Sequence, residues 1–91
     1  MNTAVNAAVM VKVVLTSGTA KQFTNGATEV MVAAKNVRQM VKALEVKYPG
    51  LGTVIETTMS VAINGTILPE PFLEEVNGES EIFVLPRIGG G

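Results

Sequence analysis

The residues whose type most suggests chemistry are the three glycines that close the sequence, Gly89, Gly90 and Gly91. Glycine has no Cβ, so a glycine run is thin, leaves its carbonyl carbons unhindered and adopts unusual φ values at low cost. Such a tail could pass through a narrow channel in a partner enzyme, which would activate the terminal carboxylate with ATP for attack by a nucleophile. We therefore predict that Gly91 is the reacting residue and that Gly90 accompanies it in the channel.

The side chains that usually perform catalysis are missing from this chain. It contains no Cys and no His, which excludes disulfides, thiolate nucleophiles, imidazole bases and most transition-metal sites. The net charge of −1 provides no electrostatic attraction toward nucleic acid. We expect a protein on which enzymes act rather than an enzyme, and the lack of Cys favours a reducing, cytoplasmic location.

The 91 residues are expected to form one domain, residues 1–91, because a chain of this length can build one core and little more. We interpret residues 1–8 as a loose lead-in, since they lack the basic start of a signal peptide, and residues 86–91 as a flexible tail. No apolar run reaches the roughly 18 residues that span a bilayer, so no membrane partner is expected. The mean hydropathy of +0.37 predicts that some apolar surface faces a partner.

Strand-like and turn-like segments alternate along most of the chain. Five segments are predicted strands: 9–15, 29–33, 59–63, 66–68 and 81–85. The first is rich in Val on both faces, so we expect both faces to be largely buried. Asn64-Gly65 predicts a type I′ hairpin turn, which needs positive φ at both residues. The polar residues 16–28 and 69–80 are expected to be turns and loops.

One amphipathic helix is predicted after Asn36. Its apolar stripe recurs at helical spacing in Val37, Met40, Val41, Leu44 and Tyr48. Asn36 suits the N-cap, Gln39 could reach back to it as in a capping box, and Pro49-Gly50 would end the helix. No second helix is evident, which disfavours a ferredoxin-like fold.

The order β-β-α-β-β predicts an α+β fold in which one main helix lies across one face of a mixed, four- to five-stranded sheet. With the first and last strands at the centre, this is the β-grasp fold of ubiquitin. Alternation in the last strand points Ile82 and Val84 to the core, and Phe83 and Leu85 to the opposite face. We predict that Phe83 and Leu85 form a partner patch, extended by Met59 or by the outward neighbours of Val61, unless an extended loop covers them.

The C-terminal half resembles the ThiS/MoaD family of sulfur-carrier proteins. The matching elements are Ile63-Asn64-Gly65, the acidic turn Asn77-Gly78-Glu79, Leu85-Pro86 and the closing glycines. The helix and its Tyr-Pro-Gly-Leu end resemble those of the family as well, so the resemblance covers about residues 9–91.

Aligned in this way, Gly90 and Gly91 are the terminal pair of the family, Gly89 replaces the small residue before them, and Ile88 takes the place of a Val. Arg87 replaces the usual second proline, which would leave the tail less stiff, and the acidic turn lacks the usual Asp.

The resemblance implies a mechanism carried out by partners. An activating enzyme would use ATP and magnesium to adenylate the Gly91 carboxylate, a sulfur donor protein would displace AMP to leave a thiocarboxylate, and a synthase would accept the sulfur. The chain itself would bind no cofactor and no metal. Together with the face predicted from alternation, the predicted tail and partner-binding residues are Phe83, Leu85, Pro86, Arg87, Ile88 and Gly89. The pathway stays open between molybdopterin-type and thiamine-type biosynthesis.

Two other functions fit the same residues. A ubiquitin-like modifier would join Gly91 to lysines of other proteins, because it begins with the same acyl adenylate. A non-reactive β-grasp interaction subunit would have a tail that is merely flexible.

Overall fold

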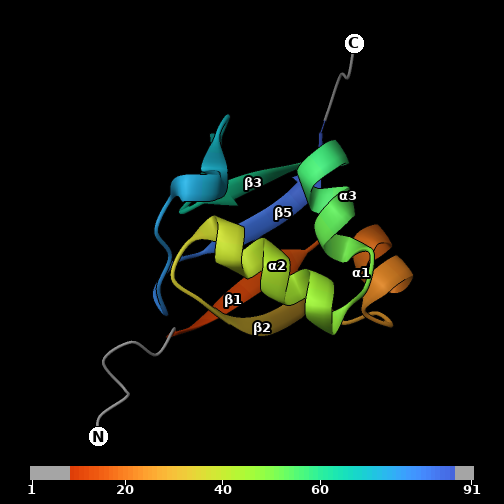
Figure 1. Ribbon diagram of the computed structural model, residues 1–91. Coiled ribbons are helices and arrows are strands. Elements are labelled where there is room, and N and C mark those ends of the chain that lie inside the picture. Colours follow the sequence, from red (N-terminus) through yellow and green to blue (C-terminus); the bar gives the residue numbers. More distant parts are fainter. Residues whose placement is uncertain (1–8, 88–91) are drawn as a thin grey trace, which may run out of the picture.

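The five predicted strands pair into one mixed sheet in the computed structural model, which describes residues 9–87 (Figure 1). Their bounds are Val9–Leu15 (β1), Glu29–Ala34 (β2), Met59–Ile63 (β3), Thr66–Leu68 (β4) and Ile82–Pro86 (β5). The strand order is β2-β1-β5-β3-β4, in which β1 and β5 are parallel and the other neighbours are antiparallel. The predicted β-grasp class and the inner positions of the first and last strands are confirmed.

The main helix, α2 (Val37–Lys47), begins at the predicted cap: Gln39 N donates to Asn36 Oδ1 at 2.8 Å. The capping box differs from the prediction, because the Gln39 side chain accepts from Lys35 N at 2.9 Å rather than from Asn36 N. The stripe packs as expected, with four members buried and Tyr48 half-buried against the core.

Two further helices correct the prediction of a single one. The segment 16–28, expected to be turns, contains α1 (Ser17–Phe23), and α3 (Leu51–Thr58) directly follows Gly50. Helix α1 begins where Thr16 accepts a hydrogen bond from Thr19 N, and it buries Thr19 and Ala20. A short 3-10 helix, η2 (Pro71–Leu73), also interrupts the predicted loop 69–80.

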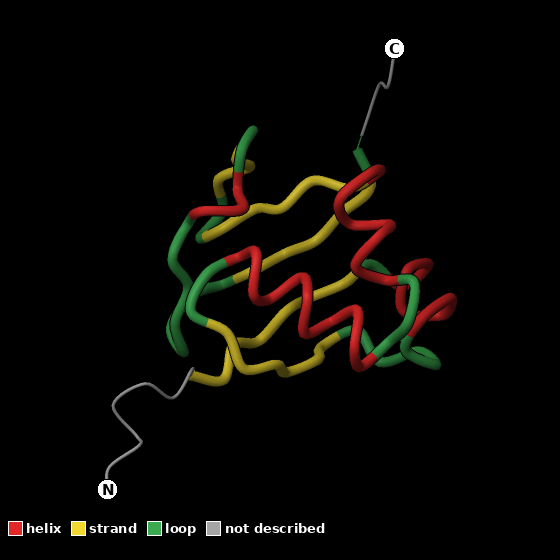
Figure 2. The backbone as a smooth tube through the Cα atoms, viewed as in Figure 1, coloured by secondary structure: helices red, strands yellow, loops and turns green. Residues whose placement is uncertain are grey.

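The helices α2 and α3 cover one face of the sheet, as Figure 2 shows. On β1, Val11 and Val13 face them and are fully buried, whereas Met10 is 52% exposed and Lys12 is also exposed. The prediction that both faces of this strand are buried is therefore wrong, because the helices pack on one side only.

The hairpin between β3 and β4 has the predicted geometry: Asn64 has φ 52° and Gly65 has φ 86°, as a type I′ turn requires. Among residues 9–87, none of the helices is both long enough and apolar enough to cross a membrane.

Candidate functional site

The strand that leads to the glycine tail, β5, lies at the centre of the sheet between β1 and β3. Its side chains alternate as predicted: Ile82 and Val84 are fully buried, Phe83 is 41% exposed and Leu85 is half-buried. Phe83 and Leu85 therefore lie on the face that the helices leave open.

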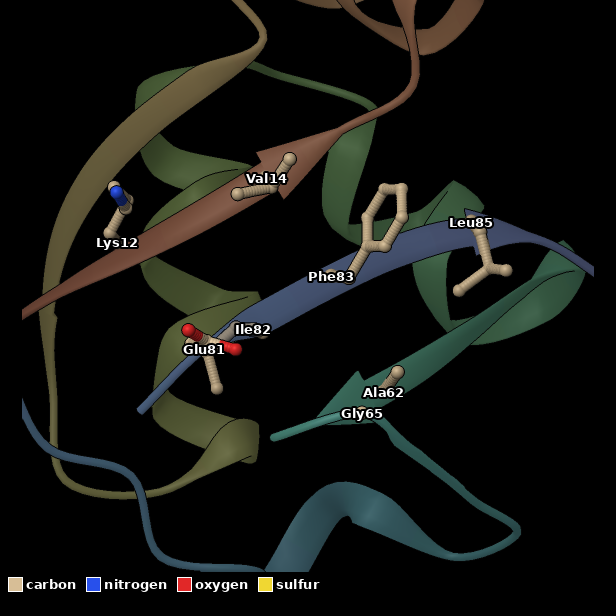
Figure 3. Close-up of a pocket in the computed structure, with 8 residues that line it drawn as sticks. All are labelled: Lys12, Val14, Ala62, Gly65, Glu81, Ile82, Phe83 and Leu85. Carbon is tan, nitrogen blue, oxygen red and sulfur yellow. The ribbon is translucent and has the colours of Figure 1, made fainter. Parts of the chain in front are cut away.

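A hollow of about 360 Å³ lies on this open face around β5 (Figure 3). Its lining residues are Lys12, Val14, Ala62, Gly65, Glu81, Ile82, Phe83 and Leu85. Phe83 is paired with Val14 of β1 on one side and with Ala62 of β3 on the other, so three strands supply the apolar floor. Lys12 and Glu81 lie toward the end that is farther from Leu85 (Figure 3). The arrangement can receive an apolar side chain beside one positive and one negative charge.

The proposed extensions of the patch divide between the two faces. Met59 is 9% exposed and belongs to the core, which corrects its assignment to the patch. Of the outward neighbours of Val61, Ala62 contributes to the hollow, whereas Ser60 is half-buried opposite Leu85 and does not line it. No loop among residues 9–87 covers Phe83, which keeps 41% of its surface.

Sequence reasoning missed the contribution of β1 to this site. The sequence predicts only that both faces of residues 9–15 are largely buried, yet Lys12 and Val14 of this strand line the hollow. The alternation of β1 marks them as sharing a face, but only the parallel pairing of β1 with β5 brings that face beside Phe83.

The root of the tail is attached to the junction of α3 and β3. Pro86 ends β5 opposite Met59, and Arg87 N donates to Thr58 O at 3.0 Å. The Arg87 guanidinium Nη2 also donates to Met59 O, at 3.1 Å. The prediction that residues 86–91 form a flexible tail is therefore wrong for its first two residues, because Pro86 belongs to β5 and Arg87 is held by two hydrogen bonds. Ile88, Gly89, Gly90 and Gly91 lie outside the described residues, as do residues 1–8.

The Glu45 carboxylate of α2 holds the start of α3, the helix whose last residue, Thr58, accepts a hydrogen bond from Arg87. Glu45 accepts hydrogen bonds from Gly50 N at 2.8 Å and from Thr53 N at 3.1 Å, at the start of α3. These bonds to backbone N–H groups lower the pKa of Glu45 below its ordinary value. Gly52 permits the close approach of the two helices, because a Cβ there would lie 2.7 Å from Glu45 Cβ and 2.9 Å from Val41 O.

Comparisons with known proteins agree with this fold. A model of the ThiS family matches residues 14–91. The solution structure of small archaeal modifier protein 1 from Methanosarcina acetivorans is similar, with 25% identity and a TM-score of 0.74 over 92% of this chain and 98% of that chain. The complex of BexX and CysO from Amycolatopsis orientalis contains a chain with the same fold, at 18% identity and a TM-score of 0.75 over 89% of this chain and 99% of that chain. No curated protein matches the sequence.

Proposed function

Because this chain belongs to the ThiS family of ubiquitin-like sulfur carriers, we propose that it carries sulfur as a thiocarboxylate on Gly91. The observation that carries the proposal is the family match, which runs from the end of β1 through the last glycine. The position of β5 supports it, since the strand that ends in the glycine tail is also the strand that exposes the apolar hollow. One partner could therefore contact the sheet and the tail together.

The proposed reaction needs two steps at Gly91. In the first, a carboxylate oxygen attacks the α-phosphorus of ATP, the bond to pyrophosphate breaks, and an acyl adenylate forms with Mg²⁺ balancing the phosphate charges. In the second, a sulfur nucleophile such as hydrosulfide attacks the carbonyl carbon, a C–S bond forms, the C–O bond to AMP breaks and a proton is released. Glycine leaves that carbon open to attack. The catalytic groups for both steps belong to partners, so the chain acts as a substrate and not as an enzyme.

The activating enzyme is proposed to dock on the hollow around Phe83. Apolar anchors in desolvated pockets provide most of the binding energy at protein interfaces, and the hollow offers an apolar floor of Val14, Ala62 and Phe83. Its charged end, with Lys12 and Glu81, would orient the partner. CysO, which has the same fold, is seen in a complex with BexX.

The thiocarboxylate would then pass its sulfur to a synthase, in a molybdopterin-type or a thiamine-type pathway of the cytoplasm. A sulfur donor protein supplies the second step, and ATP and magnesium bind to the activating enzyme.

Intact mass spectrometry tests this function. The protein is incubated with the candidate activating enzyme, ATP, Mg²⁺ and sulfide, and a gain in mass equal to the exchange of one oxygen for one sulfur is expected at the C-terminus. The variant that lacks Gly90 and Gly91 is the matched control and should gain nothing. An unchanged mass in the full-length chain with every activating enzyme of the same genome, or unchanged pathway activity after the deletion, would favour the non-reactive interaction subunit.

A second candidate is a protein modifier, which the similarity to small archaeal modifier protein 1 favours. In that case the acyl adenylate is passed on until a lysine amine attacks the Gly91 carbonyl and an isopeptide bond forms. A ladder of conjugates that contain this chain in a cell lysate, absent when Gly90 and Gly91 are deleted, would identify that function.

A further inference from the structure

Arg87, the last residue that the structure describes, bonds to two consecutive backbone carbonyls. Its backbone N–H donates to Thr58 O at 3.0 Å and its guanidinium Nη2 donates to Met59 O at 3.1 Å. Thr58 is the last residue of α3 and Met59 is the first of β3. The root of the tail is therefore held to one helix–strand junction by both its main chain and its side chain.

The two carbonyls face opposite sides of β3. The bond from Arg87 N to Thr58 O continues the ladder between β3 and β5, to which the bond from Asn64 N to Glu81 O also belongs. Backbone groups of successive strand residues point to opposite sides, so Met59 O points away from β5. On that side of β3, strand β4 pairs with β3 only as far as Val61, so it does not reach Met59. The Arg87 side chain thus crosses β3 to donate to a carbonyl that the sheet leaves without a strand partner.

The junction that receives these bonds is itself fixed. Met59 is 9% exposed, and its N–H donates to Ile55 O at the end of α3. The Thr58 hydroxyl donates to Val54 O at 2.9 Å. A contact supported by packed elements in this way holds its direction more closely than one made to a loop.

We propose that Arg87 is a positioning residue that sets the direction in which residues 88–91 leave the sheet. The inference rests on the proposed function, in which those residues enter a channel of the activating enzyme. A tail whose root is already oriented loses less conformational entropy on entering the channel. A guanidinium suits the task, because it is always charged and its hydrogen bonds are charge-assisted. Arg87 lies four residues before Gly91, so its effect falls on the binding of the tail and not on the chemical step.

Kinetics of adenylation by the activating enzyme, followed as pyrophosphate release, test the proposal in three variants. Arg87→Ala removes the bond to Met59 O, and we expect the KM for the carrier to rise about tenfold, as the loss of one charge-assisted hydrogen bond implies, with kcat unchanged. Arg87→Lys keeps the positive charge but replaces the planar guanidinium by a hydrated point charge on a flexible stem, and we expect it to recover little of the wild-type KM. Arg38→Ala removes an exposed arginine of α2 and is the matched charge control, with no change expected.

Two kinetic results would overturn the proposal. The first is an Arg87→Ala variant whose KM for the carrier equals that of the wild type, whether or not its kcat is lower. The second is a wild-type KM in Arg87→Lys, since the partner would then recognise the positive charge itself.

A measurement on the free protein separates this inference from the proposed function. Residual dipolar couplings of the Gly89, Gly90 and Gly91 amides should be larger in the wild type than in Arg87→Ala, and equal couplings would refute the positioning role. Failure of the wild type to form any adenylate would contradict the proposed function alone, because the couplings report on Arg87 without any partner.

Discussion

Phe83 of β5 lies directly opposite Val14 of β1 in the parallel pairing of the two central strands. This pairing joins an N-terminal strand to the strand that leads into the tail, and it builds the floor of the hollow on the open face of the sheet. The candidate docking surface is therefore a product of topology, and its most exposed aromatic side chain is the first target for a test.

Replacing Phe83 by Glu should weaken binding to the activating enzyme by about thirtyfold or more, because an interface anchor contributes about 2 kcal/mol or more. The fold should remain, since 41% of Phe83 is exposed. Met31→Glu is the matched control, as Met31 is also 41% exposed but belongs to the edge strand β2. Titration calorimetry measures the binding and circular dichroism the fold. An unfolded Phe83→Glu variant would show that Phe83 is part of the core.

Gly52→Ala should destabilise the domain by about 1–3 kcal/mol, the usual cost of overpacking. A Cβ at Gly52 would lie 2.9 Å from Val41 O, and backbone cannot move aside as a flexible side chain can. Gly18→Ala in α1 is the control, because a Cβ there meets nothing within 4 Å. Ala also has the higher helix propensity, so this control should be neutral or slightly stabilising. Urea denaturation compares the two, and equal stabilities would contradict the close contact between α2 and α3.

Glu45→Gln should lower stability at neutral pH and flatten its dependence on acid pH. The pKa of Glu45 is lowered in the folded state by the N–H groups of Gly50 and Thr53, so its contribution is fully present above the unfolded pKa. That contribution is lost as the pH falls below the ordinary value of 4.5 through the folded pKa. Thermal unfolding between neutral pH and strongly acid pH measures the effect.

Glu56→Gln is the control for Glu45. Glu56 is an exposed residue of α3, and unlike Glu45 its carboxylate accepts no hydrogen bond from any group within residues 9–87. If the stability of the wild type and of Glu45→Gln depended on pH in the same way, the carboxylate would not hold the start of α3.

Features that depend on neighbouring residues could be predicted from the sequence. The strands, the Asn36 cap and the Asn64-Gly65 turn follow from side-chain period, capping and turn chemistry, all of which act over a few residues. The family was also recognised from ordered local motifs and is confirmed by the match over residues 14–91. The role of Gly91 stays a prediction.

The helix α3 could be identified only from the tertiary structure. Residues 51–58 contain β-branched side chains that favour helix weakly, yet α3 forms because Leu51 and Ile55 are buried and Glu45 accepts hydrogen bonds from its first turn. These contacts are made with residues outside the segment 51–58, so the pattern within the segment does not predict them.

The same distinction applies to the site. Sequence by itself determined that Phe83 and Leu85 share a face and that glycines follow them, because alternation and composition are properties of the chain. The hollow and the anchoring of Arg87 required the fold, because Val14, Thr58 and Met59 reach these positions only through strand pairing between segments far apart in the chain.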